Sequence, residues 1–393
     1  MTKSYLKPMK IIIAPDSFKG SLTNLEAASA MERGVHAAIP NAEVEIIPIA
    51  DGGEGTLQAL VASTNGQFIK AEAIDPIGRP VTRQFGVLGD GKTIIIEMAE
   101  VSGLLLLKKA ERNPLITSTY GTGMLVRKAL DLGYRKFIIG VGGSATNDGG
   151  AGMAQALGVR FLREDKTEIS ENLCGELLSD VVAIDVSKLH AAISQSHIVV
   201  ACDVRNPLLG KFGCTQVYSP QKGATPAMVQ QLERNMAMFT ELAEKTTGLS
   251  VRNIPGAGAA GGLAAGFMLF LGAKFQPGID IVLDACGFSE RIKNATFILT
   301  GEGKIDRQTS FGKTISGIAL RAKPLNIPVI AFAGIVENAA DLLDIGVTQY
   351  YSIRPESMSL EQSMADAALL LQNSVEKVLR EMTSKPIRDA ENA

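Results

Sequence analysis

The residues 140–150, with the sequence GVGGSATNDGG, combine five glycines with hydroxyl, amide and carboxylate side chains. Glycine lets a backbone approach a ligand closely and adopt positive φ angles. The run follows an apolar segment at 137–139 and precedes a helical pattern at 153–157. Because the first N–H groups of a helix have no partners within it, this arrangement favours a phosphate site over a tight turn capped by Asp148. Its candidate phosphate-binding residues are Gly142, Gly143, Ser144, Thr146 and Asn147.

Charged residues also follow the predicted strands, where ligands bind in open α/β sheets. A single Asp after a strand is often a helix cap or a turn former. Five strand ends of this kind, four of them also rich in glycine, instead indicate a site. The residues concerned are Asp16, Ser17, Lys19, Asp51, Glu54, Asp148, Asp203, Arg205, Glu302 and Asp306.

These residue types suit phosphoryl transfer, which needs positioning, charge neutralisation and usually one base. Carboxylates hold Mg²⁺ together with phosphate oxygens and water. Lysine acts as a point charge on phosphate, and arginine grips a carboxylate with two hydrogen bonds. The alternative for each lysine is a solvated loop charge. The candidate cations are Lys19, Lys222 in PQKGA, Lys304, Lys313 and Arg205.

Two further motifs are near matches to nucleotide-binding signatures. FGKT at 311–314 ends like a P-loop, but Arg307 stands where that motif needs glycine. GAGAAG at 256–261 matches G-x-G-x-x-G, with Asp280 about twenty residues further on, as a ribose-binding acid would be. No convincing strand precedes Gly256, so we expect a close-packed loop there. A nicotinamide-dependent dehydrogenase remains an alternative.

The elements that must position these residues begin and end as a βαβ pattern, which predicts a parallel sheet. The expected strands are 10–14, 44–50, 297–300, 328–333 and 347–351. Between them, 68–74, 81–88 and 93–98 predict an antiparallel meander, followed by a helix at 120–133 and strands at 137–139 and 197–202. We therefore expect a Rossmann-like α/β domain (9–65 with 286–381), interrupted by an inserted α+β domain (66–285), between flexible termini (1–8 and 382–393).

The composition limits the classes of function. A chain of 393 residues usually forms two domains, and a net charge of −2 gives no electrostatic reason to expect nucleic acid. Four cysteines and three histidines show no metal-type spacing, which indicates reduced thiols in the cytoplasm. The uncharged segment 254–273 reads as a glycine-rich loop and a buried helix, not a membrane span. No signal peptide is expected. The substrate is expected to be small, and self-association is left open.

Seven spaced blocks together resemble the type 1 glycerate kinase family of bacteria. They are IAPDSFKGSLT (13–23), DGGEGT (51–56), GGSATNDGGAG (142–152), CDVRNPLLG (202–210), PQKGA (220–224), PGAGAAGGL (255–263) and GEGKIDRQT (301–309). The resemblance implies a Rossmann-like domain, an inserted α+β domain and a cleft between them. It also implies ATP-dependent phosphorylation of D-glycerate, giving 2-phosphoglycerate; the residues themselves do not separate the 2-hydroxyl from the 3-hydroxyl.

The roles within that reaction are hypotheses. Asp203 is the first candidate for the base that accepts the hydroxyl proton, with Asp16 and Asp148 as alternatives and Lys19 near the phosphates. Arg205 would hold the glycerate carboxylate, with Ser17 and Lys222 also toward the substrate. Gly258, Gly301 and Lys313 are assigned to the nucleotide, and Asp51, Glu54 and Asp306 to Mg²⁺. A non-catalytic binding protein for small acids is a further alternative.

Overall fold

The structure, a computed structural model, describes residues 9–49, 55–306, 309, 313–337 and 339–384. The chain divides into two compact units: residues 1–51 with 282–393, and residues 52–281. Helix α2 (Thr56–Ser63), which the sequence analysis assigned to the first domain, lies in the second unit. The reason is packing, since Leu57 and Val61 lie against Gly86, and the Leu57 N–H donates to the buried Glu97 carboxylate over 2.8 Å.

The first unit contains a parallel sheet with the strand order β13-β12-β11-β1-β2. Residues from both halves of the chain therefore build one sheet, as the sequence analysis predicts for a Rossmann-like domain. From β1 the chain moves outward to β2 on one side, and it later returns beside β1 as β11. The strands are β1 (Lys10–Ile13), β2 (Glu43–Ile46), β11 (Phe297–Ile305), β12 (Val329–Val336) and β13 (Gln349–Ser352).

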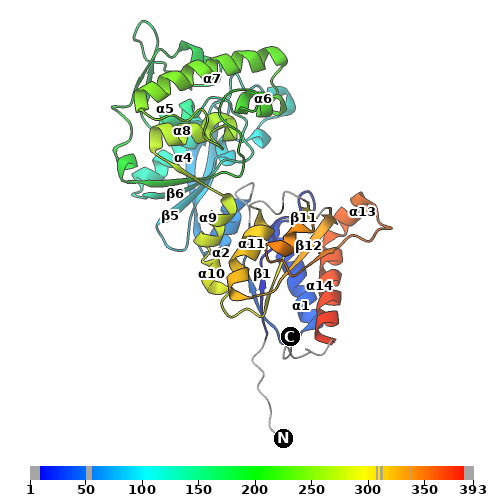
Figure 1. The fold of residues 1–393 in the computed structure, drawn as a ribbon. Coiled ribbons are helices and arrows are strands. Elements are labelled where there is room, and N and C mark those ends of the chain that lie inside the picture. Colours follow the sequence, from blue (N-terminus) through cyan, green and yellow to red (C-terminus); the bar gives the residue numbers. More distant parts are fainter. Residues whose placement is uncertain (1–8, 50–54, 307–308, 310–312, 338, 385–393) are drawn as a thin grey trace. The chain divides into compact units, whose positions relative to one another are not determined.

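Helices cover both faces of this sheet. Helices α1 (Asn24–Ala38) and α14 (Ala367–Ser384) lie side by side on one face (Figure 1) and share a buried cluster with Ile11 and Phe332. Helix α11 (Thr314–Ala322) packs with α12 (Asp341–Asp344) on the other. Helix α1 begins at the predicted capping box, in which Thr23 and Glu26 bond each other's backbone N–H groups. The other helices described in this unit are α10 (Phe288–Arg291) and α13 (Leu360–Ala365), while α9 (Gly278–Ala285) begins in the second unit and ends in the first.

The second unit contains a mixed sheet with the order β10-β9-β6-β5-β4-β3. Strands β3, β4 and β5 form the predicted antiparallel meander, while β5, β6, β9 and β10 run parallel. The carboxyl ends of four neighbouring strands therefore meet at one edge. The strands are β3 (Gln67–Ile74), β4 (Pro80–Val87), β5 (Thr93–Glu97), β6 (Lys136–Gly140), β9 (His197–Ala201) and β10 (Lys274–Gln276), and a separate two-stranded antiparallel sheet consists of β7 (Arg160–Leu162) and β8 (Ala183–Asp185).

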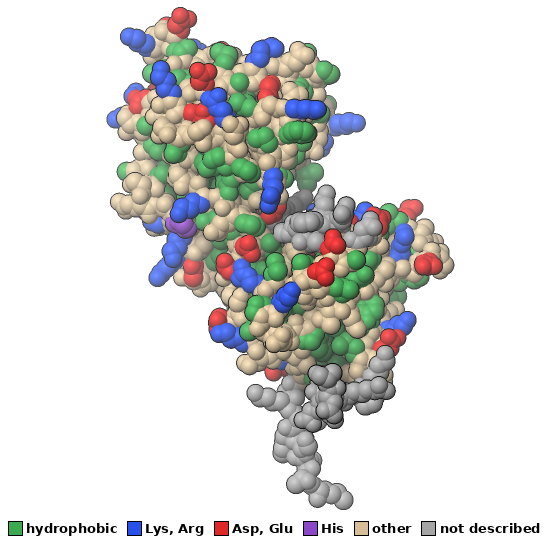
Figure 2. Space-filling view, in the orientation of Figure 1, with side chains coloured by type: hydrophobic (Ala, Val, Ile, Leu, Met, Phe, Trp, Pro, Cys, Tyr) green, Lys and Arg blue, Asp and Glu red, His purple; other side chains and the backbone are tan. Residues whose placement is uncertain are grey.

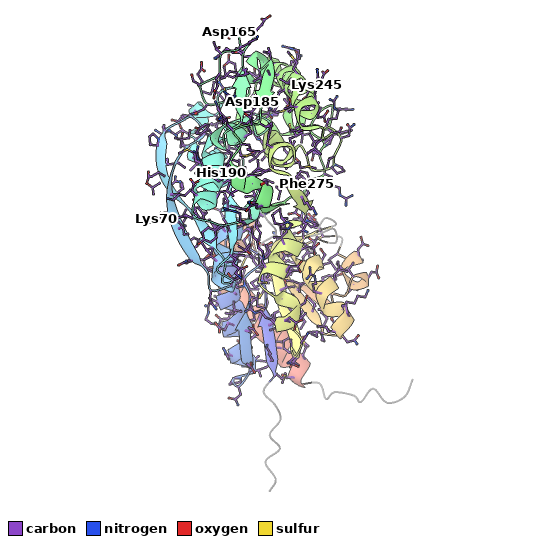
Figure 3. All side chains as sticks on the ribbon, turned by 90° about the vertical axis from the view of Figure 1, so that its left-hand side faces the viewer. Lys70, Asp165, Asp185, His190, Lys245 and Phe275 are labelled. Carbon is purple, nitrogen blue, oxygen red and sulfur yellow. The ribbon has the colours of Figure 1, made fainter. Side chains whose placement is uncertain are left out.

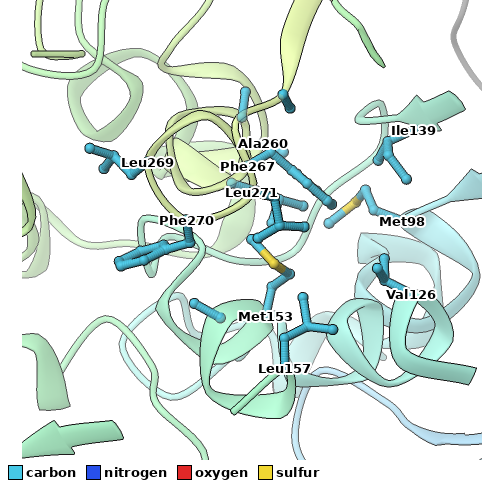
Figure 4. Packing of buried hydrophobic residues seen from close by; sticks show 14 of the residues in the cluster. Met98, Val126, Ile139, Met153, Leu157, Ala260, Phe267, Leu269, Phe270 and Leu271 are labelled. Carbon is cyan, nitrogen blue, oxygen red and sulfur yellow. The ribbon is translucent and has the colours of Figure 1, made fainter. Parts of the chain in front are cut away.

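One large hydrophobic core holds the second unit together. Phe267 and Leu271 pack with Met153 and Leu157 in this core (Figure 4). Asp165 and Asp185 of the β7–β8 region lie well away from Phe275 of β10 (Figure 3). The helices are α3 (Ala99–Ser102), α4 (Tyr120–Asp131), α5 (Ala151–Ala156), α6 (Cys214–Tyr218), α7 (Pro226–Thr247) and α8 (Leu263–Leu271). Short 3-10 helices are η1 (Leu104–Leu106), η2 (Lys109–Glu111), η3 (Leu177–Asp180), η4 (Ala191–Gln195), η5 (Pro220–Lys222), η6 (Ala259–Gly262) and, in the first unit, η8 (Lys323–Leu325).

Three further observations concern the chain as a whole. Helix α14 extends through Ser384, so residues 382–384, predicted to be flexible, are helical. Lysine, arginine, aspartate and glutamate side chains are interspersed on the face drawn in Figure 2. Among the helices that the structure describes, none combines the length and the apolar character needed to cross a membrane.

Candidate active site

A cavity of about 380 Å³ lies in the first unit, at the carboxyl ends of its parallel strands. The segment after β1 and the end of β11 both line it, at the point where the chain reverses its direction of travel across the sheet. Open α/β sheets bind their ligands at such a switch point. The predicted residues that this cavity brings together are Asp16, Ser17, Lys19, Asp306 and Lys313.

Asp16 lies just beyond the carboxyl end of β1, where hydrogen bonds hold both its backbone and its side chain. Its side chain is only 8% exposed, and its backbone N–H donates to the Gly301 carbonyl over 2.9 Å. One carboxylate oxygen accepts from the Ser17 N–H at 2.6 Å, and the other accepts from the Thr314 hydroxyl at 2.7 Å. These donors hold both oxygens of the carboxylate, which lines the cavity.

Glu302 in β11 and Asp306 directly after it add further carboxylates to the same cavity. Glu302 is buried, and its Oε1 accepts from the Thr309 hydroxyl at 2.6 Å. The same hydroxyl accepts from the Asp306 N–H at 3.1 Å. The sequence analysis took GEGKID for a loop after a strand ending at Thr300. The structure corrects this, because β11 continues to Ile305 along β12, which positions Glu302 on the strand and Asp306 immediately after it.

Three lysines line the cavity beside these acids. Lys304 pairs with Glu337 at 2.9 Å. Lys19 is exposed and Lys313 is half-buried, and neither side chain has a partner among the residues that the structure describes. Ammonium groups next to anchored carboxylates suit a ligand that carries both phosphate and a divalent cation.

The glycine-rich loop of the second unit is organised differently. Asp148 is fully buried, and its Oδ2 accepts from the Thr119 N–H at 2.8 Å and from the Thr119 hydroxyl at 2.7 Å. Its carboxylate also accepts from the N–H groups of Gly150 and Gly152, at 3.1 and 3.3 Å. Burial raises the pKa of Asp148 despite these donors. The first N–H groups of α5, considered above as an anion seat, thus face the chain's own carboxylate.

Lys222 likewise makes its side-chain hydrogen bonds inside the protein. Its side chain is 2% exposed, and its Nζ donates to Ser144 Oγ and to the Thr146 carbonyl, both at 2.7 Å. Burial lowers the pKa of Lys222 to about 8, although Cys214 and Asp148 favour its charged form. The lysine therefore ties η5 to the 142–147 loop from the inside.

The rest of this loop divides into a surface tip and a buried base. Gly142 and Gly143 are exposed, whereas Ser144, Thr146 and Asn147 are buried. Asn147 donates to the Thr215 hydroxyl at 3.1 Å, while its Oδ1 and the Thr146 hydroxyl have no partner in the described structure. The exposed part of this loop is therefore its tip, Gly142 and Gly143, beyond the carboxyl end of β6.

Asp203 and Arg205 follow β9, the neighbour of β6, and both side chains are exposed. The Gly278 N–H, just beyond β10, donates to Asp203 Oδ1 at 2.9 Å. Arg205 has no side-chain partner among the described residues. A fixed carboxylate beside an uncommitted guanidinium matches the needs of a substrate that has both a hydroxyl and a carboxylate.

The glycines of GAGAAG have a packing explanation. A Cβ on Gly261 would lie 2.0 Å from the Thr146 carbonyl, and one on Gly258 would lie 2.3 Å from the Pro207 carbonyl. The segment is thus pressed against the 142–150 loop and the 202–210 segment, as expected for a close-packed loop. Gly301 is similarly confined, since a Cβ there would lie 2.4 Å from the Phe332 carbonyl.

The metal assignment falls partly outside the described residues, because Asp51 and Glu54 lie there. Within the described residues, no group of three or more His, Cys, Asp or Glu side chains is placed to hold a metal ion. All four cysteines are free.

Sequence reasoning also missed the apolar residues of the cavity, such as Leu360 and Met364, because their i, i+4 spacing is that of any core-facing helix.

Comparison with known proteins decides what kind of protein this is. A profile of the glycerate kinase family matches residues 11–383. The chain belongs to the glycerate kinase family. It is accordingly an enzyme, a kinase.

Relatives from several bacteria agree with this assignment. A glycerate kinase of Halalkalibacterium halodurans is 47% identical over 94% of this chain and 97% of its own. The glycerate 2-kinase of Escherichia coli is 44% identical over 88% and 89%. A crystal structure from Salmonella typhimurium LT2, described as a candidate glycerate kinase 2, aligns with a TM-score of 0.86 at 41% identity, covering 96% of this chain and 99% of its own.

Proposed function

We propose that this kinase transfers the γ-phosphoryl group of ATP to the 2-hydroxyl of D-glycerate, giving 2-phospho-D-glycerate and ADP. The observation that carries the proposal is the first-unit cavity, in which lysines stand beside anchored carboxylates at the switch point of a parallel sheet. The name of the Escherichia coli relative, glycerate 2-kinase, supports the 2-hydroxyl as acceptor. The four cysteines of this chain are free, which fits a cytoplasmic location, and we propose that location as well.

The donor set of the cavity fits Mg²⁺, which prefers carboxylate and phosphate oxygens. Asp306 would hold the ion together with phosphate oxygens and water, while Asp16 and Glu302 line the same cavity. When bound, the ion neutralises charge on the phosphates. Lys19 and Lys313 would hold phosphate oxygens as point charges.

Substrate activation falls to the residues after β9. The Asp203 carboxylate would accept the proton of the 2-hydroxyl as its oxygen bonds to the γ-phosphorus and the bond to ADP breaks. Arg205 would grip the glycerate carboxylate through two N–H groups. We assign Asp148 and Lys222 to the support of the 142–147 loop, because hydrogen bonds inside the protein already engage both side chains.

The test is ADP release from Mg-ATP with D-glycerate, followed by direct coupling of the product to enolase. Enolase consumes 2-phosphoglycerate, whereas 3-phosphoglycerate first needs a mutase. We expect ADP release with direct coupling. Coupling only after addition of the mutase would move the acceptor to the 3-hydroxyl, and folded protein without glycerate-dependent ADP would refute the proposal.

A further inference from the structure

The cavity of the first unit has a second, apolar wall that the catalytic roles above leave unused. Ile335 and Ile353 contribute to it from the ends of β12 and β13, and Leu360, Met364 and Ala367 from α13 and the start of α14. Polar residues of the same cavity come from the segment after β1 and from β11. One cavity therefore joins a charged side to an apolar side.

The two large apolar side chains on α13 are only partly buried. Leu360 is 48% exposed and Met364 is 36% exposed, so neither is enclosed in the core. Helix α13 is instead fixed by Ser359, whose hydroxyl accepts from the Gln362 N–H at 3.2 Å, and by the buried Ser363. Large apolar side chains that face an open cavity favour a ligand with apolar surface.

The charged and apolar sides adjoin each other at the turn after β1. A Cβ on Gly20 would lie 2.8 Å from Met364 Cε, so this turn touches the wall directly. Gly20 has a φ of +81°, which any other residue would adopt only with strain. Lys19, one residue earlier, therefore projects from a turn that rests against the apolar wall.

A ligand that fits both sides has an anionic end and a flat apolar end. We propose that the nucleobase of the phosphoryl donor lies against the wall of Leu360, Met364 and Ile353, with its phosphates toward Lys19 and Lys313. The placement rests on the proposed function for its donor, a nucleoside triphosphate. The cavity volume of about 380 Å³ is within the range of small-molecule sites.

The experiment separates the base from the phosphates by using two probes, ATP and inorganic triphosphate. Binding of each to the full chain is measured by calorimetry without glycerate, for wild type and for Leu360→Asn with Met364→Gln. These neutral, similarly sized changes should weaken ATP binding about tenfold and leave triphosphate binding within twofold. Lys19→Met and Lys313→Met should weaken the binding of both probes.

The matched control is Leu369→Asn on α14, since Leu369 is 58% exposed and does not line the cavity. It should bind both probes as wild type does. Wall variants with wild-type ATP affinity, or with equal losses for ATP and triphosphate, would overturn the placement of the base. The proposed function would still stand in that case if the wild type phosphorylates glycerate. A wild type that binds neither probe and releases no ADP would overturn both.

Discussion

Two neighbouring strands of the second unit, β6 and β9, are each followed by a segment with an aspartate, and these two aspartates have opposite environments. Asp148 is enclosed and accepts four hydrogen bonds from Thr119, Gly150 and Gly152. Asp203 is exposed, with the Gly278 N–H on one oxygen. The cations differ in the same way, because Lys222 is buried and Arg205 is exposed. A charged residue of such a motif is therefore either buried and bonded inside the protein or exposed at its surface, and its partners in the fold decide which.

The largest effect is expected for Asp203→Asn. The amide oxygen can still accept from the Gly278 N–H, but the group no longer takes up a proton. We expect kcat to fall roughly 10²–10⁴-fold, with the free energy of unfolding changed by less than about 1 kcal/mol. Steady-state kinetics and urea denaturation test this. Near wild-type kcat in folded protein would show that Asp203 is not the base.

Asp148→Asn should reverse that pattern. An amide NH₂ at this fully buried position faces N–H or O–H donors whichever way it turns, so we expect roughly 3 kcal/mol loss of unfolding free energy. Urea denaturation measures the loss. Thr119→Ser, which keeps the hydroxyl, is the matched control and should cost less than about 1 kcal/mol. A stable Asp148→Asn protein that has lost kcat would instead point to a catalytic role.

Lys222 should reveal its burial through the pH dependence of stability. Its pKa is about 8 in the folded protein and 10.5 ordinarily. The folded state therefore releases the proton first, and stability rises as pH increases from 8 to 10.5 by about 3 kcal/mol. Below pH 8 this contribution is absent.

The measurement is the difference in unfolding free energy between wild type and Lys222→Met across that pH range. Cys214, a neighbouring group whose pKa burial raises to about 11, is present in both proteins, so its own contribution to the pH dependence largely cancels in this difference. Lys222→Gln should give the same pH dependence as Lys222→Met. A difference that stays constant with pH would contradict the depressed pKa.

Arg205→Lys should show the smallest effect. Loss of the two-pronged grip on a carboxylate should raise the KM for glycerate roughly tenfold, with the KM for ATP and the unfolding free energy unchanged. Steady-state kinetics with each substrate varied in turn gives the result. An unchanged KM for glycerate would remove Arg205 from the substrate site.

Much of the fold could be predicted from local patterns. The buried strand β1, the capping box of Thr23 and Glu26 and the meander of β3 to β5 follow from periodicity and turn residues. The length of β11 could not be predicted, because Gly301 and Gly303 read as a loop. Their strand conformation depends on pairing with β12, whose carbonyl at Phe332 leaves no room for a side chain at Gly301.

The candidate site was predictable by residue type and less so by role. The sequence indicated Asp16, Lys19 and Lys313 as candidate site residues, and in the structure all three line one cavity. It did not indicate the wall of Leu360 and Met364, since apolar residues at helical spacing usually face a core. Nor could it separate Asp148 from Asp203, because both follow strands in glycine-containing segments.

The sequence by itself determined the family resemblance, most of the strands along the chain and the set of candidate phosphate-binding residues and carboxylates, because these depend on residue identity and short-range spacing. The tertiary structure decided which of those groups are buried inside the protein and which stay exposed. Thr119 reaches Asp148 across 29 residues, and Lys222 reaches Ser144 across 78. The segments that bury a side chain and supply its hydrogen-bond partners lie far apart in the chain. Packing alone therefore distinguishes a side chain that is bonded inside the protein from one that is exposed.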